Sequence, residues 1–316
     1  MPDQKEAGKA FEFAILSTAS NFLSRRTSTQ IVENSSLKIA EASFNMFDSV
    51  SKEKYLKAAY SAFEHIVLLE PKLSSANDNN DVLELQLAPD NLGNKGDVRD
   101  VLFIKSKQNW EIGISAKNNH RAVKHSRLSD KLDFGTEWFG LNCNKSYFDY
   151  INPYFLELRK LKSEGKMWRE LKNKADRFYL PILTGFKNEL MLLNKQNSQS
   201  IPSKLLKYLI GGKDFYKVIK RNRKTEIYGF NFNGSLNKPT KHIRPQFKVA
   251  QLKLPKRIIE LDFKVGSKDT LLLVCSEGWS VSFRIHNASS RIEPSLKFDI
   301  NLVGQPPTLY SHHVSW

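Results

Sequence analysis

The sequence predicts a mixed α/β protein, and three patterns along the chain indicate this fold class. Apolar residues recur at helical spacing over residues 6–22 and 51–69. Apolar and polar residues alternate over residues 83–89, and a second strand-like region follows at 98–117. Further strand-like runs fill the C-terminal third. Helices followed by a sheet, more helices and more strands are typical of mixed α/β architectures.

Two helices are predicted in the N-terminal part of the chain, over residues 6–22 and 51–69, and the segment between them, residues 24–48, is expected to be helical in part. The first helix carries its apolar stripe on Phe11 and Ile15, and the second carries it on Tyr55 and Ala59. Pro71 cannot continue a helix and is expected to end the second one. We therefore expect two amphipathic helices in this part of the chain.

A β-hairpin is predicted between residues 98 and 117. The strand-like runs VRDVLFI and WEIGISAK flank the polar turn KSKQN. Pairing the strands about this turn places Val101 opposite Ile114 and Phe103 opposite Ile112. These apolar side chains then share one face, which the core would bury.

The other face of the hairpin carries residues that suit phosphodiester hydrolysis. Asp100 lies across from Ser115, and Lys117 is one step diagonal, so their Cβ atoms are expected to lie about 5 to 7 Å apart. A carboxylate can hold Mg²⁺, and a lysine can orient or deprotonate the attacking water or stabilise developing charge. Asp97 is expected to cap a turn, and Glu111 is expected to be a solvated charge.

A basic helix is predicted after the hairpin, over residues 118–130, with Asn118 or Asn119 as its N-cap. Such a helix would carry cations away from the same end of the hairpin. Its candidates for contacts to DNA are Asn118, His120, Arg121, Lys124 and Arg127.

The charge balance predicts a polyanionic partner. Lys and Arg number 49 against 33 Asp and Glu, which gives a formal net charge of +16. DNA, RNA or an anionic membrane surface could match this charge. No apolar run approaches the roughly 18 residues of a spanning helix, and the N-terminus lacks a secretion signal. Nucleic acid is therefore favoured over a membrane. The two cysteines, Cys143 and Cys275, form no CxxC pair, so we expect reduced thiols in a cytoplasmic protein.

Most of the excess charge lies in residues 201–260, which contain 15 Lys or Arg and three Asp or Glu. We expect a nuclease core over residues 1–200 and a basic, strand-rich DNA-binding region over 201–316, unless residues 194–203 are only a surface loop. Arg284, His286 and Asn287 are candidates for reading bases. The candidates for phosphate contacts are Arg221, Arg223, Lys224, Lys241 and Arg244.

The hairpin resembles the PD-(D/E)xK nuclease core of many type II restriction endonucleases. Asp100 matches its first acid and Lys117 its lysine, but Ser115 replaces the second acid. The resemblance implies an S-x-K variant that recruits a carboxylate from a helix, and GKAFE at 8–12 resembles the G-x-A-F-E pattern of such a helix. Glu12 is therefore the candidate for the second metal-binding acid. The alternatives are Asp130, Asp133 and Glu64.

At closer range, four segments resemble the HaeIII-type restriction endonucleases: GDVRDVLF, GISAKNNHRAVKHSRLS, DFGTEWFG and FDINLVGQPP. The resemblance implies a restriction-endonuclease fold and Mg²⁺-dependent cleavage of double-stranded DNA at GGCC that leaves 5′-phosphates. It also implies a bacterial cytoplasmic setting and a cognate DNA methyltransferase. A palindromic target would favour a homodimer. The alternatives are another nuclease of this superfamily, in repair or recombination, and a non-catalytic DNA- or RNA-binding protein.

Overall fold

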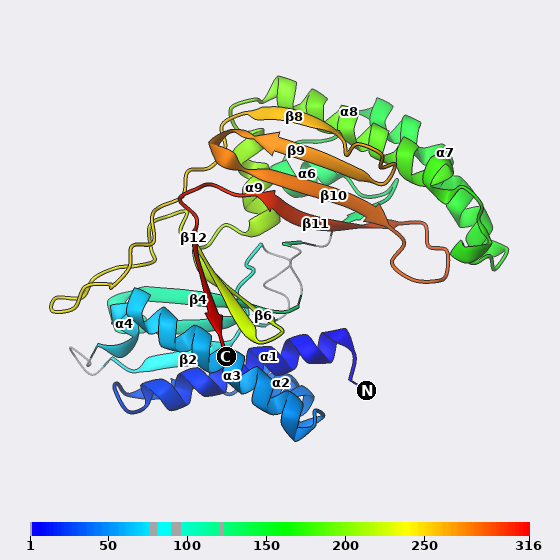
Figure 1. Cartoon of the computed structure of the whole chain (residues 1–316). Coiled ribbons are helices and arrows are strands. Elements are labelled where there is room, and N and C mark those ends of the chain that lie inside the picture. The colour runs from blue at the N-terminus through cyan, green and yellow to red at the C-terminus, as the bar shows by residue number, and fades with distance from the viewer. Residues whose placement is uncertain (1, 76–80, 90–95, 120–122, 125) are drawn as a thin grey trace. The chain divides into compact units, whose positions relative to one another are not determined.

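The chain folds into two compact units, shown in the computed structural model of Figure 1. The structure describes residues 2–75, 81–89, 96–119, 123–124 and 126–316. The first unit comprises Met1–Arg121, Gly211–Leu252 and Thr308–Trp316, and the second comprises Ala122–Ile210 and Lys253–Pro307. The units therefore do not divide at residue 200 as predicted, because residues 211–252 and 308–316 return to the sheet of the first unit.

The first unit is built on a seven-stranded mixed sheet, ordered β1-β2-β3-β4-β6-β7-β12. The β1–β2 and β4–β6 pairs are parallel, and the other neighbours are antiparallel. Its strands are β1 (Thr29–Ile31), β2 (Leu83–Leu87), β3 (Val101–Lys105), β4 (Trp110–Asn118), β6 (Phe215–Arg221), β7 (Lys224–Phe230) and β12 (Tyr310–Ser315). This arrangement confirms the predicted mixed α/β class.

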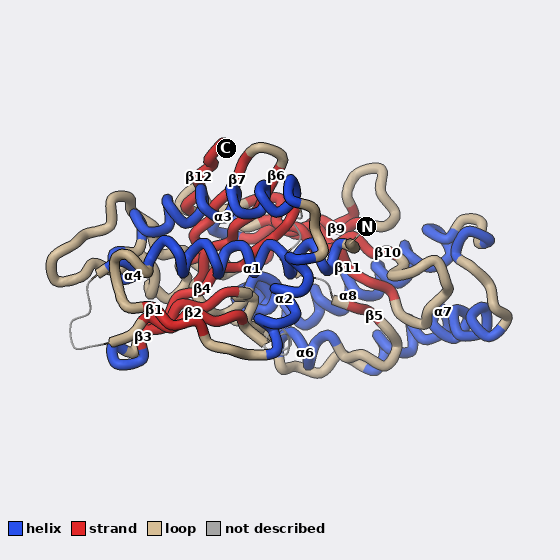
Figure 2. The backbone as a smooth tube through the Cα atoms, turned by 90° about the horizontal axis from the view of Figure 1, so that it is seen from below, coloured by secondary structure: helices blue, strands red, loops and turns tan. Residues whose placement is uncertain are grey.

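Helices α1 (Gln4–Leu23) and α3 (Ser49–Leu69) lie next to each other across the first sheet, as Figure 2 shows. Asp3 caps the N-terminus of α1, and its carboxylate accepts a hydrogen bond from the backbone N–H of Glu6 in a capping box. The predicted apolar stripes face one shared core with the sheet. The shorter helices are α2 (Ser35–Asn45), α4 (Pro71–Ser74) and η1 (Ser106–Gln108).

The second unit contains an antiparallel sheet ordered β5-β11-β10-β9-β8. An aromatic cluster fills its core: the Phe186 ring lies 4.8 Å from Phe134 and 5.1 Å from Phe298. The strands are β5 (Arg127–Leu128), β8 (Ile258–Phe263), β9 (Thr270–Cys275), β10 (Ser280–His286) and β11 (Leu296–Gly304). The helices are α6 (Phe134–Phe139), α7 (Lys145–Ser163), η2 (Trp168–Glu170), η3 (Ala175–Tyr179), α8 (Leu180–Gln196), α9 (Ile201–Ile210) and η4 (Ser276–Gly278).

The prediction of a basic helix over residues 118–130 is wrong for the described part of that range. Asn119 has a φ of +57°, which ends the extended run of β4. Farther along, the Val123 N–H donates to the Ile300 carbonyl at 2.8 Å, and β5 pairs with β11. Leu128 is fully buried in that pairing, so the segment satisfies its backbone groups through a sheet instead of a helix.

No helix in the described parts of the chain has both the length and the apolar character needed to span a membrane.

Candidate active site

The β3–β4 hairpin has the predicted register. Val101 pairs with Ile114 and Phe103 pairs with Ile112, and all four side chains are buried in the core shared with the helices. Because side chains alternate along a strand, this burial leaves the other face of β4 to Ser115 and Lys117. The hairpin thus holds its polar residues at the end opposite to the turn.

Asp100 is the centre of the cluster at that end. Its Oδ2 accepts hydrogen bonds from Ser115 Oγ at 3.2 Å and from Lys117 Nζ at 3.1 Å. The backbone N–H of Ala116 donates to the same oxygen at 2.7 Å. The Asp100 backbone is held between two strands, since its N–H donates to Ile114 and its carbonyl accepts from Ala88. The carboxylate is therefore fixed by residues of β4, while the backbone of Asp100 is held from both sides.

The charged groups of this cluster are accessible from one side. The side chains of Lys117 and Asp100 are 30% and 23% exposed, while Ser115 is 2% exposed. Ser115 thus forms the floor of the site, and the ammonium and carboxylate groups lie where a substrate phosphate can reach them.

Glu12 brings a second carboxyl group to Asp100. It lies on α1, which packs against β4, and it is buried except for 8% of its surface. The pKa of Glu12 is raised to about 7, mainly by burial and also by the negative charge of Asp100, while Lys9 and Lys117 act to lower it. Lys9 Nζ lies 3.0 Å from Glu12 Oε2. Two carboxyl groups that repel each other in this way favour a bound cation.

The donor set fits Mg²⁺, which keeps several water ligands and needs only one or two protein carboxylates. Among the described residues, no group of three or more His, Cys, Asp and Glu is arranged to hold a metal ion. Asp100 and Glu12 would therefore hold the ion together with oxygen atoms from water and phosphate. Zinc sites in proteins usually include Cys or His ligands, and neither residue type is among the described residues of this cluster.

The other candidate acids lie elsewhere. Asp130 forms an ion pair with Arg159, and Asp133 caps α6 through the Thr136 N–H; both belong to the second unit. Glu64 is exposed on α3 and lines an open pocket together with residues of α1, α3 and β12 and with Arg25, which follows α1. The charge of Asp100 raises the pKa of Glu12, which supports Glu12 as the second acid of the cluster.

A buried arginine supports the strand that carries Asp100, and the sequence reasoning did not find it. Arg99 is 5% exposed, and its guanidinium binds both oxygens of Asp97 at 2.7 and 2.8 Å. It also reaches Glu111 at 3.2 Å, and Lys213 binds the same carboxylate at 2.8 Å. Glu111 is therefore an ion-pair partner and not a freely solvated charge, contrary to the prediction.

Gly113 makes room for this arginine. A Cβ atom at Gly113 would lie 2.4 Å from Arg99 Cδ, so a larger residue would displace the arginine. Lys217 is a second residue that the sequence reasoning missed. It is 6% exposed and pairs with Ser115 across the parallel β4–β6 contact. That long-range pairing has no local signal in the sequence, whereas Lys9 could have been found from its i,i+3 spacing to Glu12.

Several of the predicted DNA contacts are engaged with other protein groups. Lys124 Nζ donates to the Tyr208 carbonyl at 3.0 Å and lies over the Tyr208 ring, and burial lowers its pKa. Arg127 binds Glu293 at 3.0 Å. The remaining predicted cations with a carboxylate partner are Arg221 and Lys224, both at Glu226, and Arg284, at Asp269.

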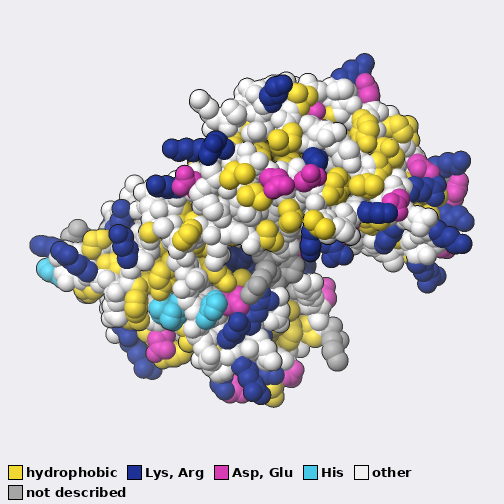
Figure 3. Space-filling view, turned by 45° about the horizontal axis from the view of Figure 1, so that its top comes forward, with side chains coloured by type: hydrophobic (Ala, Val, Ile, Leu, Met, Phe, Trp, Pro, Cys, Tyr) yellow, Lys and Arg dark blue, Asp and Glu magenta, His cyan; other side chains and the backbone are white. Residues whose placement is uncertain are grey.

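The other predicted contacts differ in their surroundings. Asn118 Nδ2 lies 3.4 Å from the Tyr55 hydroxyl, inside the first unit. Arg223, Lys241 and Arg244 are exposed. His120 and Arg121 lie outside the described residues. Figure 3 shows Lys and Arg side chains at many points of the displayed face, interspersed with apolar ones.

A mixed α/β fold with a carboxylate–lysine cluster is expected of a restriction endonuclease, and comparison with known proteins establishes that class. The family model described as HaeIII restriction endonuclease matches residues 8–306. The chain therefore belongs to the HaeIII restriction endonuclease family. It is 43% identical over 311 residues to the type II restriction enzyme HaeIII of Haemophilus aegyptius. The matched residues make up 98% of this chain and 97% of that relative. No solved structure matches the chain.

Proposed function

We propose that the chain is a PD-(D/E)xK-type restriction endonuclease that cleaves double-stranded DNA at GGCC in the presence of Mg²⁺ and leaves 5′-phosphates. The observation that carries this proposal is the cluster in which Asp100 accepts bonds from Ser115 and Lys117 beside the carboxyl group of Glu12. The target sequence and the product ends are supported by the resemblance to HaeIII-type enzymes and by the family match.

The residues of the cluster divide the work of hydrolysis. Asp100 and Glu12 would hold the cation, which when bound would stabilise the charge on the phosphate as a Lewis acid. Lys117 extends its ammonium group from the end of β4, where it can orient the attacking water and stabilise negative charge on the phosphate. Ser115 fixes the Asp100 carboxylate from below. Attack of water on phosphorus, in line with the P–O3′ bond, forms a new P–O bond and breaks P–O3′. The water loses a proton, the leaving O3′ takes one up as a hydroxyl group, and the phosphate stays on the O5′ atom of the downstream nucleotide.

The palindrome suggests how the enzyme would act on both strands. A two-fold symmetric site is matched by two copies of the protein related by the same symmetry, so we propose a homodimer as the species that cuts. A DNA methyltransferase with the same target sequence would protect the host genome. Both the homodimer and the methyltransferase are inferred from the proposed GGCC target, so a different target would remove the argument for them.

Plasmid digestion tests the proposal, because a specific enzyme cuts a defined plasmid into discrete fragments. We expect fragments that match the spacing of GGCC sites in the presence of Mg²⁺ and intact plasmid when EDTA is added. Sequencing the fragment ends should place every cut within GGCC, and the ends should ligate without added kinase because they carry 5′-phosphates. Premethylated plasmid serves as the matched control for the target sequence.

Two outcomes would contradict the proposal. Diffuse degradation would point to a less specific nuclease of the same superfamily, with a role in repair or recombination. DNA binding without any cleavage would favour a protein that keeps the fold as a non-catalytic scaffold.

A further inference from the structure

Residues 238–248 form an arm whose two ends meet at one asparagine. The side chain of Asn237 donates to the Phe247 carbonyl at 3.0 Å and accepts from the Val249 N–H at 3.0 Å. Asn237 has a φ of +61°, a conformation that asparagine tolerates better than most residues. One side chain thus closes the base of the arm, as in compact surface loops whose ends lie close together.

The arm is also fixed to the end of α3 in the first unit. Asn237 Nδ2 donates to the Leu69 carbonyl at 2.9 Å, and the Gln246 N–H donates to the Leu68 carbonyl at 2.9 Å. The tip is closed by two bonds between Thr240 and Ile243, each 2.9 Å long. The arm therefore has a defined shape without regular secondary structure, and little ordering entropy would be lost when it binds a partner.

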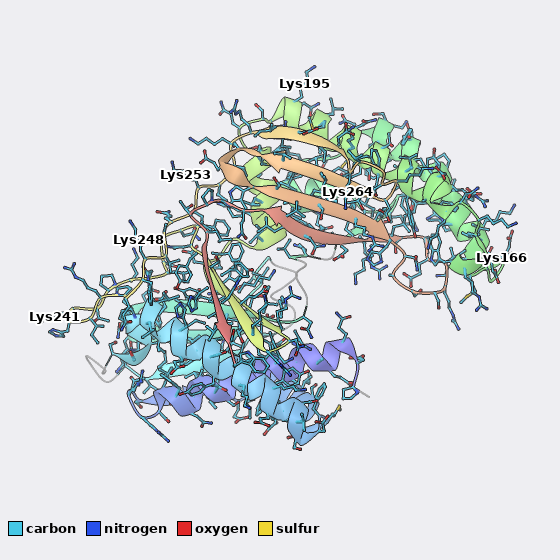
Figure 4. The ribbon with its side chains drawn as sticks, viewed as in Figure 1. Lys166, Lys195, Lys241, Lys248, Lys253 and Lys264 are labelled. Atoms are coloured by element: carbon cyan, nitrogen blue, oxygen red, sulfur yellow. The ribbon has the colours of Figure 1, made fainter. Side chains whose placement is uncertain are left out.

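The arm is strongly basic and extends away from the sheet of the first unit, as Figures 1 and 4 show. Its eleven residues include four Lys or Arg and no Asp or Glu, and the run without acids extends from 227 to 259. The four cations are exposed, and within the described residues none has an ion-pair partner. They are Lys238, Lys241, Arg244 and Lys248. By contrast, Arg221 and Lys224 share the buried carboxylate of Glu226.

The tip adds an apolar group to this charge. Ile243 lies between His242 and Arg244 and is 47% exposed, although its backbone closes the tip. Clustered cations bind the phosphates of a duplex, and exposed apolar side chains among them are used by proteins that enter the minor groove. A protein partner of the same arm would need an acidic surface, and the proposed substrate already supplies the required negative charge.

We propose that the arm binds the substrate duplex, with its four cations on phosphates and Ile243 against the sugars of the minor groove. The proposal rests on DNA as the substrate and adds the surface that holds it. The arm would act before chemistry and independently of the metal, because none of its residues belongs to the Asp100 cluster.

Salt-dependent binding tests the arm apart from cleavage. The probe is a labelled duplex that contains GGCC, and anisotropy is measured in EDTA over a series of salt concentrations. Each phosphate contact contributes about 0.9 to the slope of log K against log salt, so Lys241→Ala with Arg244→Ala should lower the slope by about 1.8. Ile243→Ala should leave the slope unchanged, weaken binding on the order of tenfold and expose sugars to hydroxyl-radical cleavage.

The matched control removes two exposed lysines outside the arm, Lys166 and Lys195, which Figure 4 labels with Lys241. We expect Lys166→Ala with Lys195→Ala to keep the wild-type slope. Wild-type slope in the arm variant, or an equal drop in the control, would overturn the proposal. Plasmid cleavage by the wild type is measured separately. The result can therefore contradict DNA binding by the arm while it supports the proposed function, or contradict the proposed function while it supports the arm.

Discussion

Replacing Asp100 with Asn should reduce the rate of DNA cleavage by about a thousandfold or more, which corresponds to about 4 kcal/mol of transition-state stabilisation. The amide has the shape of the carboxylate and can still accept the bond from the Ala116 N–H. It lacks the negative charge that would hold a cation and that pairs with Lys117 at 3.1 Å. Single-turnover cleavage of a plasmid measures the effect.

A second carboxylate on the same sheet provides the control for Asp100→Asn. Glu84 lies on β2, where it pairs with Ile104 of β3. Glu84→Gln removes one negative charge from this region without touching the cluster, so its cleavage rate should equal that of the wild type. If Asp100→Asn cleaved DNA at the wild-type rate and had an unchanged melting temperature, Asp100 would not be an active-site residue.

Lys117→Ala should lower the cleavage rate by about a hundredfold to a thousandfold, the usual loss when one group that stabilises transition-state charge is removed. DNA binding in EDTA should change little, because one phosphate contact among many is lost. This split separates a role in the chemical step from a role in binding. The measurement combines single-turnover cleavage with anisotropy on the same duplex.

Lys107 is the matched control for Lys117. It lies in η1, at the turn of the same hairpin and at the end opposite to the cluster. Lys107→Ala removes the same charge from the hairpin and should cut at the wild-type rate. If both variants lost activity equally, the effect would reflect the net charge of the hairpin and not a position at the reacting phosphate.

The local parts of the fold could be predicted because their signals are periodic. Helices α1 and α3 follow from stripes at spacings of three and four residues, and Phe11 and Tyr55 are buried as those stripes require. The hairpin register follows from two-residue alternation about a short turn, which makes Val101 and Ile114 partners. These patterns depend only on residues that are close in sequence.

The non-local parts could not be predicted from the same patterns. Strand β6 joins the first sheet parallel to β4. Because β4 lies about a hundred residues before β6 in the chain, no local turn connects the two strands. Because this pairing is distant in sequence, the predicted boundary at residue 200 separates strands that lie in one sheet. For the same reason Lys217 could not be placed beside Ser115 from the sequence. Residues 126–128 look helical and basic in sequence, but pairing with β11 overrides that propensity.

The candidate site shows the same division. Asp100, Ser115 and Lys117 could be brought together by reasoning on one hairpin, and the structure places them within hydrogen-bond distance. Glu12 was suggested by resemblance alone, since nothing in the periodicity of α1 relates it to the hairpin. Arg99 was missed because its partners, Asp97 and Glu111, come from both strands and looked like ordinary surface charges.

Binding of Mn²⁺, followed by electron paramagnetic resonance as a stand-in for Mg²⁺, tests most directly whether Asp100 and Glu12 share a cation. Glu12 has a pKa of about 7 and is mostly protonated below that pH, so wild-type affinity should rise as the pH increases through 7. Glu12→Gln should bind more weakly and with little pH dependence, and Asp100→Asn should bind weakly throughout. Equal affinity in all three proteins at every pH would contradict a metal site at this cluster.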